Sequence, residues 1–396
     1  MTMSEGLPRI TVGLLFGGRS AEHEVSRASA ANVLRALDPA KYNVVLIGLA
    51  KDGRWLLCNA GNGAGTGAAA LAIPEDGAPL ALVPGGKGRL LRFAEGEQKS
   101  GAPHVDVMFP VLHGPNGEDG TIQGALELAA VPYVGSSVMG SAAAMDKDVA
   151  KRLARDAGLP VVPFATLTAQ APLDYATVVR AVGSTDLFVK PANLGSSVGI
   201  SRARSAEDFA QSCALAFQFD GKILAERCID RAREIECAVL EDEKGQVRAS
   251  LLGEIVPADS HGFYSYDAKY TDSKGARLII PADVSPERTE RIRELAIRTF
   301  QVLGCGGLAR IDFFLKAEEI FVNEVNTLPG FTSISMYPKL WEVSGISQPE
   351  LMDILIAHAL ARHGRRKHSI ERGALERPSE AGSLASVIAT AATCPP

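Results

Sequence analysis

The stretch GGLARIDFFLKAEEIFVNEVNTLPG, residues 306–330, governs the interpretation of the whole chain. Two apolar runs, 308–315 and 320–325, flank the polar connection 316–319. Their lengths, their β-branched and aromatic residues and the polar connection predict a β-hairpin.

Three oxygen-bearing side chains stand within these apolar strands: Asp312, Glu324 and Asn326. Glu324 and Asn326 are two residues apart and share a face, and a turn centred between residues 317 and 318 places Asp312 within one residue of opposite Glu324. Such ligands favour Mg²⁺ or Mn²⁺, which complete their shells with substrate phosphates. Arg310 projects to the same side as Asp312. One Asp alone would indicate a solvated strand face, but Arg-x-Asp paired with Glu-x-Asn favours a metal site.

The hairpin resembles the nucleotide-metal site of the ATP-grasp ligases, and NTLPGFTSIS, residues 326–335, is similar to the D-alanine–D-alanine ligase branch. The resemblance implies ATP and two Mg²⁺ or Mn²⁺ ions as cofactors, with the metal held by the three oxygen ligands. It also implies that Arg310 and the Gly330 N–H stabilise an oxyanion. The Ser335 hydroxyl and the Met336 N–H would then lie at the carboxylate of the second substrate.

Composition describes an ordinary soluble chain of 396 residues, 46% hydrophobic, with a net charge of −5. Its length indicates two to three domains, and the lack of a basic surplus argues against nucleic acid as a partner. The six cysteines form no C-x-x-C pair, which indicates reduced thiols. No signal peptide is recognisable and no window reaches the roughly 18 apolar residues of a transmembrane helix, so we expect a cytoplasmic protein without membrane contact.

Near the N-terminus, residues 10–16 and the following Ala-rich stretch predict a strand, a turn and a helix with Ser20 as the N-cap. The motif GGRSAEHEVS, residues 17–26, is similar to the N-terminal motif of the same ligases. The resemblance implies that Glu22 contacts the amino group of the first D-alanine, with Ser26 supporting Glu22. Without it, Glu22 would simply complement the helix dipole. His23 is expected on the surface.

A second strand, over 104–112, leads into HGPNGEDG, residues 113–120, and a helix to about residue 130. The resemblance implies that this motif borders the first substrate site, with His113 and Glu118 as supporting residues. The alternative is a plain Gly/Pro turn before a capped helix.

Further along, MDKDVAKRLARDAGLP predicts an amphipathic helix that begins near Lys147, and a strand over 186–189 leads to Lys190. The loop PANLGSSVGI follows, and exposed N–H groups in such a loop can cradle phosphates, although it is no Walker A motif. The resemblance implies that Lys147 and Lys190 bind ATP phosphates and that Ser196 and Ser197 belong to a loop closing over the site. An ordinary hairpin connection is the alternative.

The strand over 222–228 precedes the nucleotide contacts that the resemblance implies. They are the Glu226 side chain and the backbone of Arg227 and Ile229 for adenine, and Glu234 for the ribose hydroxyls. A surface strand of alternating charge is the alternative for residues 233–236. Paired acceptors at a hinge between domains suit an adenine edge and a sugar.

Residues 257–277 lose all periodicity after two strands expected to pair, 236–240 and 247–255. A polar segment of this length within a compact domain is typical of a functional lid. Its run FYSYDAKY resembles the mobile loop of these ligases, which implies that Lys269 reaches the ATP phosphates and Tyr270 the substrate.

Together these elements predict an α/β protein. The resemblance implies a three-domain ATP-grasp fold with an N-terminal parallel α/β (pre-ATP-grasp) domain. The domains expected are 1–137 with the first D-alanine site, 138–228 with the glycine-rich loop, and 229–364 with the mobile loop and the metal site. The last helix, over 351–363, is expected to stop at Gly364. Residues 365–396 are expected to form a disordered tail.

The resemblance covers roughly residues 9–360 and implies ATP- and Mg-dependent ligation of two D-alanines through a D-alanyl phosphate, for peptidoglycan synthesis, by a homodimer. Three alternatives remain open. They are a D-alanine–D-lactate ligase, another ATP-grasp carboxylate–amine ligase, and a nucleotide-binding protein without turnover. The intact set of lysines and metal ligands argues against the last.

Overall fold

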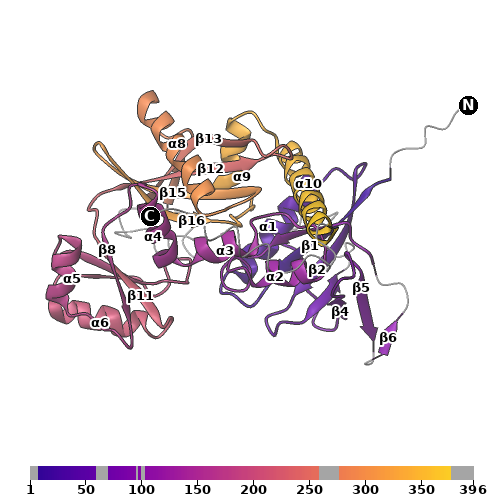
Figure 1. Cartoon of the computed structure of the whole chain (residues 1–396), viewed down its shortest axis with the longest axis horizontal. Coiled ribbons are helices and arrows are strands. Elements are labelled where there is room, and N and C mark those ends of the chain that lie inside the picture. Colours follow the sequence, from indigo (N-terminus) through magenta and orange to yellow (C-terminus); the bar gives the residue numbers. More distant parts are fainter. Residues whose placement is uncertain (1–7, 59–69, 95–96, 100–102, 258–275, 376–396) are drawn as a thin grey trace, which may run out of the picture.

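The computed structural model describes residues 8–58, 70–94, 97–99, 103–257 and 276–375. In this part of the chain, three β-sheets of seven, four and five strands follow one another along the sequence, each accompanied by helices (Figure 1). The predicted α/β class is confirmed.

The first sheet has a parallel centre. Strand β1 (Ile10–Gly17) pairs with β2 (Tyr42–Leu49) on one side and with β7 (Val107–Val111) on the other. Helices α1 (His23–Ala36) and α2 (Thr121–Leu128) cover its two faces, which is why the apolar run of β1 is uninterrupted. An antiparallel extension beyond β2 consists of β3 (Trp55–Cys58), β4 (Ala78–Leu82), β5 (Leu90–Ala94) and β6 (Glu97–Lys99).

Two expectations about α1 are wrong. The helix begins at His23, and Ser20 belongs to the preceding turn, where its hydroxyl accepts the Glu22 N–H at 3.2 Å. His23 is buried rather than on the surface, because its Nδ1 lies 2.7 Å from the Gly18 carbonyl oxygen.

The four-stranded sheet is antiparallel and has the order β10-β9-β11-β8. Helices α5 (Tyr175–Val182) and α6 (Ala206–Ala216) pack on it and enclose a separate core. Helices α3 (Val138–Met145) and α4 (Lys147–Asp156) precede it, and Asp146 caps α4 by accepting two N–H groups. The strands are β8 (Phe164–Thr168), β9 (Leu187–Pro191), β10 (Ser201–Ala203) and β11 (Lys222–Arg227).

The five-stranded sheet is also antiparallel, with the order β14-β13-β12-β15-β16. Helix α8 (Pro286–Val302) packs on one face, and α9 (Met336–Val343) packs on the other. Alternate residues of β12 reach the two cores, as strand geometry requires. The strands are β12 (Arg233–Glu241), β13 (Val247–Pro257), β14 (Ala276–Ile279), β15 (Leu308–Lys316) and β16 (Glu319–Asn326).

One apolar core joins the seven-stranded and five-stranded sheets. Residues of β1, β7 and α1 pack there with residues of β12, α9 and α10 (Gln348–Leu375). Arg362 of α10 reinforces this junction, because it donates hydrogen bonds to the carbonyl groups of Tyr133 and Gly135 and lies over the Tyr133 ring.

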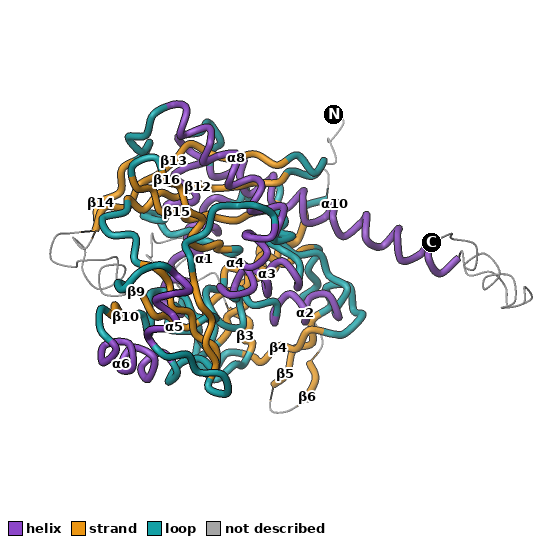
Figure 2. Tube along the Cα trace, turned by 60° about the vertical axis from the view of Figure 1, so that its left-hand side comes forward, coloured by secondary structure: helices purple, strands orange, loops and turns teal. Residues whose placement is uncertain are grey.

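Helix α10 does not stop at Gly364 as expected. It continues to Leu375 and extends beyond the body of the molecule (Figure 2). Within the described residues, Arg365 donates to the Glu243 carbonyl and Arg366 pairs with Glu127, so residues just past Gly364 still contact the body. No helix of this described part is long and apolar enough to cross a membrane.

Candidate active site

The predicted hairpin consists of β15 and β16, whose ends at Lys316 and Glu319 leave a two-residue turn, shorter than the four residues expected. The register pairs Asp312 directly with Glu324, because a bulge beside Asp312 shifts the alignment by one residue. Without this bulge, Asp312 would pair with Asn323, and the side chain of Glu324 would lie on the other face of the sheet from Asp312. The bulge therefore brings the two carboxylates together.

Arg310 is a positively charged side chain that two carboxylates hold in place at this site. Its Nε and Nη2 atoms each lie 2.7 Å from an oxygen of Asp312, and Nε lies 3.1 Å from Oε2 of Glu236 on β12. Asn326, opposite Arg310, donates to Asp312 at 3.0 Å. Burial alone would lower the pKa of Arg310, but Asp312 and Glu236 outweigh it and raise that pKa well above its ordinary value.

The donor set suits a divalent cation bound through oxygen. Asp312, Glu324 and Asn326 offer two carboxylates and one amide, and the carboxylate side chains are 16% and 28% exposed, so a phosphate can reach them. Oxygen ligands of this number are typical of Mg²⁺ or Mn²⁺ shared with substrate phosphates. Among the described residues, no cluster of three His, Cys, Asp or Glu side chains is arranged to hold a metal.

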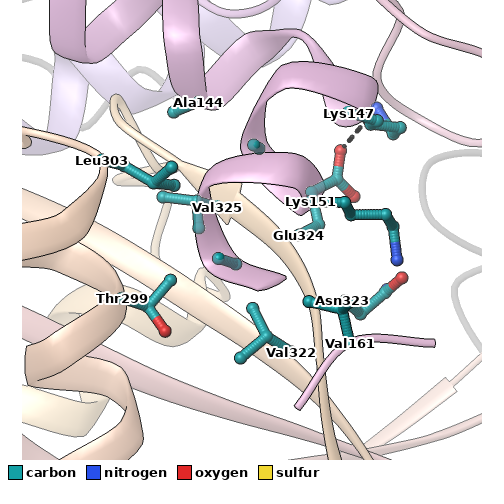
Figure 3. A pocket seen from close by; sticks show the side chains of 12 residues that line it. Ala144, Lys147, Lys151, Val161, Thr299, Leu303, Val322, Asn323, Glu324 and Val325 are labelled. Atoms are coloured by element: carbon teal, nitrogen blue, oxygen red, sulfur yellow. Dashed lines mark ion pairs between the residues drawn. The ribbon is translucent and has the colours of Figure 1, made fainter. Parts of the chain in front are cut away.

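One of the two predicted lysines, Lys147, connects this hairpin to the glycine-rich loop. Lys147, the first residue of α4, lies 2.9 Å from Glu324 Oε1 and donates to the Leu194 carbonyl at 2.6 Å (Figure 3). Lys190, on β9, lies 2.9 Å from Glu226 Oε2. Both lysines are buried. The structure thus brings Lys147 together with one of the candidate metal ligands, Glu324.

A third buried lysine, Lys151, was missed by sequence reasoning. It follows Lys147 by one helical turn and therefore lies on the same side of α4, as Figure 3 shows. Its Nζ is 3.2 Å from Glu226 Oε1. Burial lowers the pKa of Lys151 to about 8, although the charge of Glu226 opposes this shift. The i, i+4 spacing from Lys147 was the available signal, but lysines on amphipathic helices usually face solvent.

The glycine-rich loop lies between β9 and β10 and comes close to the N-terminal motif. Ser196 and Ser197 both have positive φ angles, 55° and 59°, which are uncommon for residues other than glycine and concentrate at functional sites. A Cβ atom on Gly195 would lie 3.8 Å from Glu22 Oε2. The loop that would cover the phosphates is therefore next to the residue predicted to bind the first substrate.

The predicted adenine and ribose contacts lie where the chain passes from the four-stranded to the five-stranded sheet. Glu226 is almost fully buried at the end of β11, beside Arg227, and Ile229 follows in the connection. Glu234 is the second residue of β12. Burial would raise the pKa of Glu226, but the charges of Lys151 and Lys190 hold it below its ordinary value.

Glu22 stands at the N-cap position of α1, with its carboxylate beside the HGPNGEDG motif. A Cβ atom on Gly114 would lie 3.2 Å from Glu22 Oε2. Ser26 does not support Glu22 through its hydroxyl as expected. Instead its Oγ accepts the Gly17 N–H at 2.7 Å and donates to the Val111 carbonyl, so it ties together the ends of β1 and β7.

His113 and Glu118 contact the backbone that follows the metal hairpin. His113 Nδ1 lies 3.0 Å from the Leu328 carbonyl oxygen, and Glu118 accepts the Leu328 N–H at 3.2 Å. Ser29 of α1, which was not predicted, accepts the Phe331 N–H at 3.1 Å. Residues of α1 and of the loop after β7 thus fix the position of segment 328–331, a relation across more than two hundred residues that no local pattern indicates.

We expect Glu118 to make the stability of the protein depend on pH. Burial, followed by the charge of Glu22, raises the pKa of Glu118 to about 8, against two backbone N–H groups that lower it. The pKa of Glu118 in the folded protein lies above the value of about 4.3 in the unfolded chain. The contribution of Glu118 to the free energy of unfolding is therefore fully present at low pH. It falls by up to about 1.4 kcal/mol per pH unit as the pH rises, until Glu118 ionises in the folded protein. Glu118→Gln should remove this slope between about pH 5 and 8.

Urea unfolding of the wild type and of Glu118→Gln at matched pH values measures the effect. Equal slopes for the two proteins would contradict the neutral state of Glu118. The amide cannot accept both N–H groups, so the variant is also expected to be less stable at the acidic end.

The expected site for the second substrate lies at the start of α9. Ser335 occupies the N-cap position, its Oγ accepts the Thr332 N–H at 2.9 Å, and Met336 opens the helix. The first N–H groups of a helix have no partner within it and favour an anion. A Cβ atom on Gly330 would come within 2.8 Å of Ser335 Oγ, so only glycine fits the close approach. Lys269 and Tyr270 lie outside the described residues.

Known family models match both parts of the chain. Family models described as the N-terminus and the C-terminus of D-ala D-ala ligase match residues 11–136 and 153–357. The D-alanine–D-alanine ligase B of Bradyrhizobium diazoefficiens is 65% identical over 365 residues, which cover 92% of this chain and 97% of that protein.

Two solved structures have the same fold. The D-alanine–D-alanine ligase of Coxiella burnetii is 34% identical with a TM-score of 0.79, and the match covers 94% of this chain and 99% of that one. A D-Ala:D-Ser ligase from Enterococcus faecalis is 33% identical with a TM-score of 0.75, and the match covers 89% of this chain and 100% of that one.

Proposed function

Because the chain belongs to the D-alanine–D-alanine ligase family, we propose that it joins two D-alanines into D-alanyl-D-alanine, driven by ATP, for peptidoglycan synthesis. The observation that carries this proposal is the contact of Lys147 with both Glu324 and the glycine-rich loop. It connects the candidate metal ligands to the candidate phosphate site.

In the proposed reaction, the γ-phosphoryl group of ATP passes to a carboxylate oxygen of the first D-alanine, and ADP leaves. The deprotonated amine of the second D-alanine then attacks the acyl carbon of this D-alanyl phosphate, and phosphate leaves. Lys147 and Lys190 bind the phosphates, and Ser196 and Ser197 cover them. Mg²⁺ or Mn²⁺ held by Asp312, Glu324 and Asn326 supplies positive charge that offsets the phosphate charge.

Other residues orient the two amino acids. Glu22 binds the ammonium group of the first D-alanine, and the Ser335 hydroxyl and Met336 N–H bind the carboxylate of the second. Arg310 and the Gly330 N–H stabilise the oxyanion formed when the amine adds. Fixation of segment 328–331 by His113 and Glu118 supports this last role, because it places the Gly330 N–H rigidly.

The nucleotide base and sugar have their own proposed contacts. Glu226 accepts the adenine 6-amino group, the backbone of Arg227 and Ile229 reads the rest of the edge, and Glu234 binds the ribose hydroxyls. Lys269 reaches the phosphates and Tyr270 the substrate.

Product analysis tests the proposal. The chain is incubated with ATP, Mg²⁺ and equimolar D-alanine, D-serine and D-lactate, ADP release is followed, and products are identified by mass spectrometry. D-Alanyl-D-alanine is expected to dominate. Little depsipeptide is expected between about pH 6 and 8, because the phenol of Tyr270 stays neutral there and gives no preference for an anionic partner. A dominant D-serine or D-lactate product would overturn the substrate assignment.

Three finer points are also proposals: two metal ions per site, a homodimer and a cytoplasmic location. The resemblance to the ligase family supports each of them. Metal titration followed by calorimetry, light scattering of the purified chain and cell fractionation test them in turn.

A further inference from the structure

Lys151 is a buried cation for which the proposed reaction has no role. Its side chain is 3% exposed. It extends from α4, which packs with the α8 face of the five-stranded sheet, toward Glu226 at the end of β11 in the four-stranded sheet. Burying an ammonium group is unfavourable unless an anion compensates it, so this placement calls for an explanation.

The Glu226 carboxylate lies between two ammonium groups. Lys190 Nζ is 2.9 Å from one of its oxygens, and Lys151 Nζ is 3.2 Å from the other. Lys147, one helical turn before Lys151 on α4, pairs with Glu324 instead. Lys151 and Lys190 therefore share Glu226 between them.

Lys151 and Lys190 have different surroundings when a nucleotide binds. In the proposed function, Lys190 must share its charge with a phosphate, which weakens its hold on Glu226. Lys151 keeps Glu226 ionised at that moment. If Lys151 were absent, Glu226 would take up a proton once Lys190 turns to the phosphate, and a protonated carboxyl group is a poorer acceptor for the 6-amino group.

We propose that Lys151 is a positioning residue for nucleotide selection: it holds Glu226 as an anion toward the adenine 6-amino group. This inference rests on the proposed nucleotide site. It differs from a merely structural ion pair, because a structural role would affect all nucleotides equally.

The test is the binding of ATP and of ITP, which has no 6-amino group, to the full chain with Mg²⁺ and without D-alanine, by calorimetry. Lys151→Met is expected to weaken ATP binding about tenfold, the effect of losing one charge-assisted hydrogen bond, and to leave ITP binding within about twofold. Lys222→Met is the matched control, because Lys222 pairs with Asp146 and Asp148 instead of Glu226. The preference of this variant for ATP over ITP should equal that of the wild type.

Equal weakening of ATP and ITP in Lys151→Met, or no change in either, would overturn the proposal. If Lys151→Met does not fold, the double variant with Glu226→Gln leaves no unpaired carboxylate in the pocket and is compared with Glu226→Gln alone. Adding Lys151→Met to Glu226→Gln should cause no further loss of the preference for ATP over ITP. A further loss would overturn the proposal.

Nucleotide preference and dipeptide formation are measured separately. A wild type that prefers ATP but forms no dipeptide refutes the ligase activity and leaves the role of Lys151 standing. A wild type without preference for ATP over ITP overturns the role of Glu226 and with it that of Lys151.

Discussion

Replacing Asp312 by asparagine is expected to lower kcat for dipeptide formation by about 100- to 1,000-fold, the range seen when one preorganised charge-stabilising group is lost. The substitution keeps the volume of the side chain and removes the charge that faces both the metal and Arg310. Glu324→Gln removes the other carboxylate and should have an effect of the same order.

Glu319→Gln is the matched control for these two variants, because Glu319 is an exposed carboxylate on the same hairpin. It should retain the wild-type rate. Rates are measured over a range of Mg²⁺ concentrations, with circular dichroism to confirm folding. A near-normal rate for Asp312→Asn at low Mg²⁺ would show that Asp312 is no metal ligand.

Arg310→Lys is expected to lower kcat by about 100-fold although the charge is retained. The guanidinium group spans both oxygens of Asp312 and also reaches Glu236, whereas an ammonium group is a point charge that cannot keep these contacts at once. Asp312 would then be free to move away from its place opposite Glu324.

Arg202→Lys provides the comparison for Arg310. Arg202 makes the same two-point contact with Asp186, at 2.8 and 2.5 Å, on the four-stranded sheet away from the metal hairpin. The rate of the Arg202→Lys variant should stay within about twofold of the wild-type rate, because half-exposed ion pairs contribute little to stability. Equal rates for Arg310→Lys and the wild type would contradict the role given to Arg310.

Local pattern was sufficient for much of the fold. The hairpin and the paired strands β12 and β13 follow from hydrophobic periodicity, and their observed bounds lie within a few residues of those expected. The Asp312 to Glu324 register was expected only to within one residue, because a bulge depends on packing of the whole sheet.

Errors arose where contacts outside a helix override the signals within it. His23 looks like a surface residue in its helix, but it is buried against the Gly18 carbonyl. Gly364 is a good stop signal, yet α10 continues because Arg365 and Arg366 still find partners on the body. Lys151 is indistinguishable in sequence from a solvated lysine, since its partner Glu226 is brought by a different sheet.

The apolar core shared by the seven-stranded and five-stranded sheets makes these two parts a rigid base. The four-stranded sheet encloses its own core and carries Lys190 and Glu226, so we expect it to move as a separate unit. Lys147 and Lys151 of α4 lie at the junction and contact it. We expect nucleotide entry and ADP release to follow this hinge motion. A fluorophore pair on α6 and α9 should report opening and closing, whereas a pair on α1 and α9 should keep a constant separation.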